Sequence, residues 1–200
     1  MTTIVMATGN KHKVAEMREL LAPYMGNEYR LVSMKEAGFD GDIEENGKTF
    51  AENAYIKAST VCKATGEITI ADDSGLCVDA LGGAPGIFSA RYAPPGSRKA
   101  TLLKELGDTP HEQRTARFVA SICCYLPNGD TIVADGVCEG FIAFTCRGDS
   151  GFGYDPIFEL PCGKTFAEIP SAEKDEQSHR GLALKAFAAR LNDYVKSHEE

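Results

Sequence analysis

The sequence predicts a mixed α/β fold, in which one sheet is flanked by helices. Three observations lead to this prediction. Short β-branched runs alternate with helical patterns in the first half of the chain, two long strand-like runs follow in the second half, and the hydrophobic content of 43% is ordinary for a globular protein. Early alternation favours βα units and the later pair favours an antiparallel hairpin, so we expect a sheet that is bent or split into two lobes with a central cleft.

The first half of the chain is expected to alternate strands and helices. Residues 3–7 are apolar and β-branched, as in a buried strand, and residues 11–24 carry Val14, Met17 and Leu21 on one helical face. The expected elements are, in order, a strand at 3–7, a helix at 11–24, a strand near 29–34, an acidic loop at 38–47, a helix at 48–65, a strand at 68–71 and a short strand at 76–81.

The second half begins with a helix expected at 98–106, between Ser97 as a candidate N-cap and Gly107 as a stop. Two long strand-like runs, 114–126 and 131–144, then flank an Asn-Gly pair that is typical of a hairpin turn. A glycine-rich loop at 148–155, a strand at 156–160 and a C-terminal helix after Gly181 complete the pattern.

The bulk composition excludes several classes of protein. A net charge of −8 and the lack of a basic run argue against binding to nucleic acid or to an anionic membrane surface. No apolar stretch approaches the roughly 20 residues that span a bilayer, and the chain shows no signal-peptide pattern. The seven cysteines are odd in number and form no C-x-x-C pair, which favours free thiols in a reducing cytoplasm.

The turn after the first strand is a candidate anion site. Its residues, Thr8-Gly9-Asn10-Lys11-His12-Lys13, place a hydroxyl, a glycine, an amide and lysines at the start of a helix. Backbone N–H groups at a helix start attract phosphate, and a glycine lets it approach the main chain closely. The competing interpretation is an ordinary turn with Asn10 as the N-cap.

A second candidate is the sequence Asp72-Asp73-Ser74-Gly75, where a buried strand is expected to end. Open α/β sheets place ligands at such ends, and carboxylates suit magnesium bound to a phosphate-bearing substrate. Because successive strand residues face opposite ways, we expect only one of the two aspartates to face the metal. The alternative is a turn capped by aspartate.

Three further stretches carry candidate residues whose roles the sequence leaves open. The acidic loop 40–47 and Lys57 are more typical of solvated surface than of a site, although a loop acid could bind a metal and Lys57 could lie near a phosphate. Phe152 and Tyr154, flanked by glycines, suit either stacking on a base or a tight turn with core aromatics. Lys174, His179 and Arg180 would form an anion pocket with Lys13 if the four converge.

In order along nearly the whole chain, five motifs resemble the inosine/xanthosine triphosphate pyrophosphatase family, and most closely its bacterial dITP/XTP pyrophosphatases. They are residues 7–13, residues 52–58, the run from Ala71 through Gly86 to Tyr92, residues 151–156 and Ser178-His179-Arg180-Gly181. The resemblance implies an elongated, two-lobed ITPase-like α/β fold forming a single domain over 1–200. It also implies a cytoplasmic, magnesium-dependent homodimeric hydrolase that converts ITP, dITP and XTP to the monophosphate and pyrophosphate.

The same resemblance implies roles for individual residues. Asp73 is the catalytic base and a metal ligand, and Glu44 is the other metal ligand, with the adjacent Glu45 as an alternative. The implied substrate contacts are Thr8, Gly9, Asn10, Lys11, His12, Lys13, Ser74, Phe152, Gly153, Tyr154, Asp155, Lys174, His179 and Arg180.

Three alternative functions remain open at this point. One is a house-cleaning pyrophosphatase that prefers modified pyrimidine bases. Another is a phosphoacceptor signalling domain, which also places acids at strand ends but is shorter and lacks the long hairpin. The third is a catalytically silent nucleotide-binding module, against which the acids Glu44 and Asp73 count.

Overall fold

The computed structural model describes residues 2–26 and 29–197. The chain divides into two compact units. Unit 1 comprises Met1–Asp73, Ala120–Gly136 and Leu182–Glu200, and unit 2 comprises Ser74–Val119 and Val137–Gly181. Each unit has a hydrophobic core of its own, so each is described separately.

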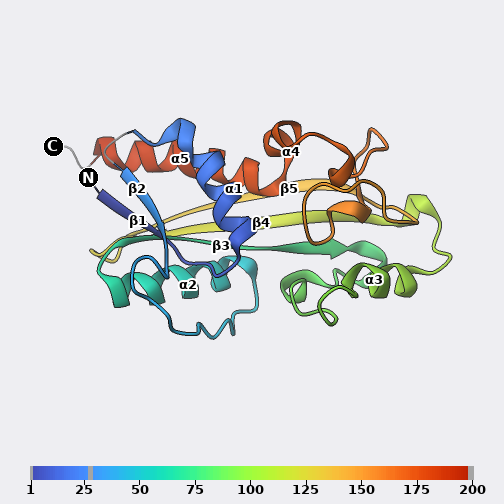
Figure 1. Cartoon of the computed structure of the whole chain (residues 1–200), viewed down its shortest axis with the longest axis horizontal. Coiled ribbons are helices and arrows are strands. Elements are labelled where there is room, and N and C mark those ends of the chain that lie inside the picture. Colours follow the sequence, from blue (N-terminus) through green and yellow to red (C-terminus); the bar gives the residue numbers. More distant parts are fainter. Residues whose placement is uncertain (1, 27–28, 198–200) are drawn as a thin grey trace. The chain divides into compact units, whose positions relative to one another are not determined.

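Six strands in the described part of the chain form one sheet in the order β2-β1-β3-β4-β5-β6 (Figure 1). Strand β1 pairs in parallel with β2 and β3, whereas β5 pairs antiparallel with β6, which confirms the predicted mixed sheet. The strands are β1 (Thr2–Met6), β2 (Tyr29–Ser33), β3 (Ile68–Val78), β4 (Thr115–Tyr125), β5 (Thr131–Ile142) and β6 (Phe158–Glu159).

The helices follow the predicted order with local differences. They are α1 (Lys11–Leu21), α2 (Phe50–Thr65), α3 (Arg98–Leu106), α4 (Ser171–Gln177) and α5 (His179–Ser197). Helix α1 ends three residues early, in a 3₁₀ turn at Ala22–Tyr24, because proline at position 23 cannot continue an α-helix. None of the helices in the described ranges combines the length and apolarity that crossing a membrane requires.

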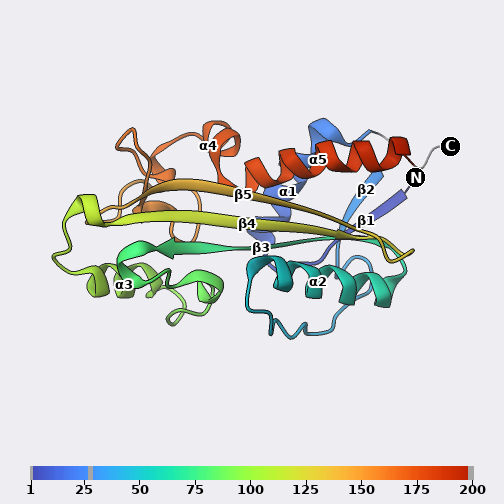
Figure 2. The same cartoon turned by 180° about the vertical axis from the view of Figure 1, so that it is seen from behind.

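In unit 1, helices cover both faces of the sheet. Figures 1 and 2 show α1 and α5 on one face and α2 on the other. The side chains of β1 alternate accordingly: Ile4 and Met6 pack with α1 and α5, whereas Val5 and Ala7 pack with α2. This alternation is the expected outcome for a parallel strand buried on both sides.

Strand β3 differs from the prediction. We expected a strand at 68–71, a turn, and a short strand at 76–81, but β3 is continuous from Ile68 to Val78 and is followed by a 3₁₀ turn at Asp79–Leu81. Acidic residues are depleted from strands because burial of their charge is costly. Here both aspartates are buried and each is paired with a lysine, which removes the reason for ending the strand at Ala71.

Two further elements differ from the prediction. The strand expected at 156–160 shortens to β6, because Asp155–Ile157 forms a 3₁₀ turn around a proline. Helix α4 was not predicted, because its sequence is polar on every face and lacks the apolar spacing of an amphipathic helix.

Unit 2 contains a buried arginine that organises its backbone. Arg114 is 1% exposed, and its guanidinium is held by carbonyl oxygens rather than by a carboxylate. Its donors reach the carbonyls of Ile142 (2.9 Å), Gly107 (3.1 Å), Thr109 (3.3 Å) and Ala143 (3.4 Å). One side chain thus ties the end of β5 to the loop that follows α3.

We expect Arg114→Met to lower the free energy of unfolding by about 3 kcal/mol or more, because it leaves several buried carbonyls without donors. Arg117→Met is the matched control, since Arg117 lies three residues further along, in β4, and forms exposed ion pairs whose loss should cost less than about 1 kcal/mol. Urea denaturation measures both. Equal losses for the two variants would contradict the role assigned to Arg114.

Candidate active site

The turn between β1 and α1 is built as an N-cap. The Asn10 side-chain oxygen accepts hydrogen bonds from the main-chain N–H groups of His12 (3.0 Å) and Lys13 (3.4 Å), and the Thr8 hydroxyl accepts one from the Asn10 N–H (3.2 Å). Gly9, Asn10, Lys11 and His12 are exposed. The capping interpretation of Asn10 is therefore confirmed, and the turn leaves a glycine main chain open to solvent beside Lys13.

Lys13 reaches from the first turn of α1 to the sheet. Its ammonium lies 2.6 Å from Asp72 Oδ2, and the Asp72 side chain is fully buried. An isolated buried carboxylate is strongly disfavoured, so this contact supplies the cation that Asp72 needs. It also fixes the position of the Lys13 ammonium at the start of α1.

Asp73, the next residue of β3, forms a second ion pair with the opposite helix. Lys57 Nζ lies 2.8 Å from Asp73 Oδ1 and 3.0 Å from Glu45 Oε2. Lys57 comes from α2 and Glu45 from the acidic loop, so one ammonium joins three segments of unit 1. The two aspartates thus face different helices, Asp72 toward α1 and Asp73 toward α2.

Burial and charge act in opposite directions on this pair. Burial raises the pKa of Asp73 above its usual value, and the attraction of Lys57 offsets only part of that rise. For Lys57, burial by itself lowers the pKa, but attraction to Asp73 and its hydrogen bond outweigh burial, and the net pKa is raised. Asp73 is therefore a carboxylate of increased basicity beside a lysine that stays charged.

The donor set around Asp73 suits magnesium. Asp73 Oδ2 is buried and has no hydrogen-bond partner among the residues that the structure describes, and carboxylate oxygens are the protein ligands that magnesium prefers. Across residues 2–26 and 29–197, no group of three or more histidine, cysteine or acidic side chains is placed to hold a metal. Magnesium is commonly bound by one or two carboxylates together with substrate phosphates, so Asp73 fits a shared site of that kind.

The acidic loop places its two glutamates differently. Glu45 is half-buried and paired with Lys57, whereas Glu44 is exposed. The structure thus brings Glu45 to the Lys57–Asp73 pair and leaves the Glu44 carboxylate at the surface of the same loop.

In unit 2, the start of α5 brings together the predicted cations His179 and Arg180. Arg180 is 3% exposed and donates to the Ser74 hydroxyl (3.0 Å), and its guanidinium carbon lies 5.8 Å from the centre of the Phe152 ring. The His179 ring stacks on Phe118, with ring centres 4.6 Å apart. Aromatic rings and N–H donors thus lie together at the start of α5.

The glycine-rich loop is locked by Asp155. Its Oδ2 accepts hydrogen bonds from the Phe152 main-chain N–H and from Lys174 Nζ, both at 2.9 Å. Lys174 Nζ also lies 5.1 Å from the centre of the Phe152 ring. A Cβ at Gly151 would lie 2.1 Å from Asp155 Oδ2, and Gly151 has φ +73°, so only glycine fits.

The two aromatic residues of this loop have different environments. Tyr154 is 4% exposed, and its hydroxyl donates to the Ser89 carbonyl (3.0 Å). Burial raises the pKa of Tyr154 to about 12. Tyr154 is therefore a core residue, and Phe152, which is half-buried and has two cations near its ring, is the ring suited to stacking.

Two of the predicted cations share a ring in unit 2, because Lys174 and Arg180 both lie near Phe152, whereas the His179 ring stacks on Phe118. In unit 1, Lys13 pairs with Asp72.

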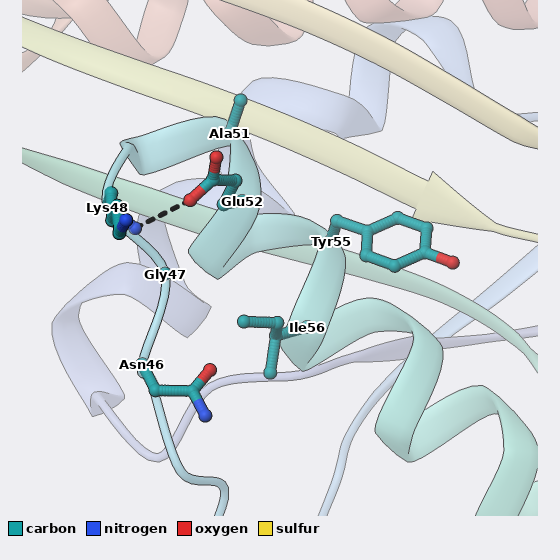
Figure 3. Close-up of a pocket in the computed structure, with 7 residues that line it drawn as sticks. All are labelled: Asn46, Gly47, Lys48, Ala51, Glu52, Tyr55 and Ile56. Carbon is teal, nitrogen blue, oxygen red and sulfur yellow. Dashed lines mark hydrogen bonds between the residues drawn. The ribbon is translucent and has the colours of Figure 1, made fainter.

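A pocket of about 600 Å³ lies beside the end of the acidic loop in unit 1. Figure 3 shows Tyr55 and Ile56 projecting from α2 and the Glu52 carboxylate bonded to the Lys48 main-chain N–H, a bond of 2.6 Å. No residue predicted to bind substrate or metal lines this pocket, whose walls are Asn46, Gly47, Lys48, Ala51, Glu52, Tyr55 and Ile56.

Comparison with known proteins places this chain in a family. The Ham1 family model matches residues 4–190. This chain belongs to the Ham1 family. The resemblance that the five motifs indicated is thereby confirmed.

Individual Ham1-family proteins match along almost their whole length. The dITP/XTP pyrophosphatase of Bacillus licheniformis is 45% identical over 199 residues, covering 96% of this chain and 99% of that protein. A HAM1 protein structure from Coxiella burnetii is 42% identical with a TM-score of 0.86, covering 96% of this chain and 100% of that one. A Mycobacterium abscessus structure described as a nucleoside-triphosphatase / dITP/XTP pyrophosphatase is 40% identical with a TM-score of 0.76, covering 92% and 97%.

Sequence reasoning gave too little weight to Lys57 and predicted no ion-pair partner for Asp72. Lys57 falls at i+3 from Ala54 and i−4 from Val61, so it lies within the apolar stripe of α2. A lysine in a buried stripe needs a buried acid, and the nearest candidates in the sequence were the paired aspartates of β3. A lysine within the apolar stripe of α2 was therefore the sequence feature that indicated pairing with an aspartate of β3.

We expect Lys57→Met to destabilise the fold by about 3 kcal/mol near pH 8, because it leaves Asp73 as a buried charge without a cation. The folded-state pKa of Asp73 then lies still further above its unfolded value. The loss of unfolding free energy in Lys57→Met is therefore smallest where Asp73 is protonated in both the folded and the unfolded protein. This loss grows as the pH rises through the folded-state pKa of Asp73.

Urea denaturation of Lys57→Met and the parent protein at about pH 5 and about pH 8 measures this trend. Lys185→Met, which removes an exposed lysine of α5, should show little change at either pH. A deficit that does not depend on pH would disprove the pairing.

Proposed function

We propose that this chain hydrolyses the non-standard purine nucleoside triphosphates dITP, ITP and XTP to the monophosphate and pyrophosphate. The family supports the reaction, because the matching relatives are named dITP/XTP pyrophosphatases. The observation that carries the proposal for this chain is Asp73, a buried carboxylate with one oxygen held by Lys57 and the other without a hydrogen-bond partner in the described part of the chain.

Asp73 is the proposed general base. Its increased basicity suits it to accept a proton from water as that water attacks phosphorus, and Lys57 fixes the carboxylate through Oδ1. Lys13 and the exposed turn at 8–13 bind the triphosphate, with Asp72 holding the Lys13 ammonium in place. Cleavage between the α and β phosphates then yields the two products.

Magnesium is the proposed cofactor. Asp73 and Glu44 would hold it, while Glu45 remains in the ion pair with Lys57. When bound, the ion supplies positive charge to the phosphate oxygens of the substrate.

Unit 2 supplies the proposed base recognition. Hypoxanthine and xanthine carry an oxygen at position 6, which accepts hydrogen bonds, whereas adenine carries an amino donor there. Arg180 and His179 supply donors, and Phe152 supplies an aromatic ring that lies near the cations Lys174 and Arg180. Donors that meet an amino group stay unpaired, and that penalty discriminates against adenine.

Three further features remain predictions. A single functional domain over residues 1–200 would comprise both units, including a few residues outside the described ranges. Assembly as a homodimer is checked by sedimentation analysis. A cytoplasmic location is consistent with seven free cysteines.

The proposal is tested with a panel of nucleoside triphosphates, with and without magnesium, that compares pyrophosphate with orthophosphate release. We expect pyrophosphate from ITP, dITP and XTP, little turnover of ATP, and loss of activity with a chelator. Asp73→Asn keeps the shape of the side chain but removes the base, so turnover should fall at least about 100-fold.

Survival of ITP turnover within about tenfold in Asp73→Asn would refute the role of Asp73. Orthophosphate as the only product would indicate attack at the terminal phosphorus and a different enzyme. A preference for modified pyrimidines would favour the alternative house-cleaning activity.

Arg180→Ala should cause a large loss with ITP, on the order of 100-fold in kcat/KM, and little gain with ATP. Steady-state kinetics with both substrates measures this. An unchanged ITP rate together with an unchanged ITP/ATP ratio would remove Arg180 from base recognition.

A further inference from the structure

Asn53, in the first turn of α2, binds the end of the acidic loop. This residue is 1% exposed, and its side-chain oxygen accepts a hydrogen bond of 2.9 Å from the Gly47 main-chain N–H. Gly47 lies two residues after Glu45, so the contact is made directly beside the glutamates of the loop. Both residues belong to unit 1.

The fit between Gly47 and α2 leaves no space for a side chain. A Cβ on Gly47 would lie 2.7 Å from Asn53 Oδ1, 2.8 Å from Glu52 Cβ and 3.0 Å from the Asn53 main-chain nitrogen. Two of these three atoms belong to rigid parts of the helix and cannot rotate away. The close approach of the loop to the helix therefore requires glycine at position 47.

The same face of α2 holds the loop a second time. Lys57 lies four residues after Asn53, one helical turn further on, and its ammonium binds Glu45 and Asp73. Residues 45–47 are thus fixed at both ends by side chains of one helix. The distance between the acidic loop and Asp73 is set by this double contact.

Asn53 carries a polar group that the fold does not satisfy. Its side-chain nitrogen is buried and has no hydrogen-bond partner among the described residues. An unsatisfied buried donor costs stability, so an apolar residue would serve packing alone better. The asparagine is instead explained by the hydrogen bond that its side-chain oxygen accepts from the Gly47 main-chain N–H.

We propose that Asn53 is a positioning residue that, through the Gly47 N–H, places Glu44 of the acidic loop for joint metal binding with Asp73. The proposal rests on the proposed magnesium-dependent function. Residues that orient metal ligands without touching the metal commonly affect metal affinity by about 10- to 100-fold when they are changed.

The test compares Asn53→Ala with Asn46→Ala, which removes an exposed asparagine one residue before Gly47. Amide hydrogen exchange at Gly47, measured on protein without metal or nucleotide, should accelerate at least about tenfold in Asn53→Ala and stay unchanged in Asn46→Ala. The magnesium concentration that gives half-maximal pyrophosphate release should rise about tenfold in Asn53→Ala alone, with kcat at saturating magnesium largely retained.

Gly47→Ala provides an independent variant. It should raise the magnesium requirement as Asn53→Ala does, and the double variant should be less impaired than the sum of the two, because both disrupt one contact. Unchanged Gly47 exchange in Asn53→Ala, or faster exchange with an unchanged magnesium requirement, would overturn the inference. A wild-type protein that releases no pyrophosphate would instead refute the proposed function, and the exchange measurement separates the two outcomes.

Discussion

Two consecutive carboxylates in the middle of a buried strand are the constraint on which unit 1 depends. A strand sends successive side chains to opposite faces, so Asp72 and Asp73 cannot share one counter-ion from one helix. Each therefore requires a lysine on its own side, and α1 and α2 supply Lys13 and Lys57. Because an unpaired buried charge is costly, the positions of both helices along β3 are tied to these two ion pairs.

This arrangement connects stability to chemistry. The ion pairs offset the cost of burying the two aspartates. They also place two lysine ammonium groups near Asp73, whose pKa is raised, and near the acidic loop. In unit 2 the surroundings of the buried cations differ, because these cations lie against aromatic rings and Asp155 and not against the acids of a strand. Charge dominates the first unit, whereas flat surfaces and directional donors dominate the second.

Periodicity predicted most of the fold, because the helices and strands that pack on the core carry their apolar residues at helical or alternating spacing. It failed for α4, which is polar on all sides, and for β3, where the local preference of aspartate against strands is overridden by lysines distant in the sequence. The candidate site residues came from short motifs, and those motifs also contained Asn53 and Lys57. Their importance was hidden because it lies in contacts with other segments, which spacing along one element does not reveal.

The distribution of the thiols has a practical consequence. Cys62, Cys123, Cys124 and Cys138 are buried, and burial raises the pKa of Cys123 and Cys138 to about 11, so these sulfurs resist alkylation. Cys146 and Cys162 are exposed, and both belong to unit 2. A maleimide dye would accordingly mark that unit preferentially in the native protein. Its fluorescence would report on events in unit 2 without any engineered cysteine.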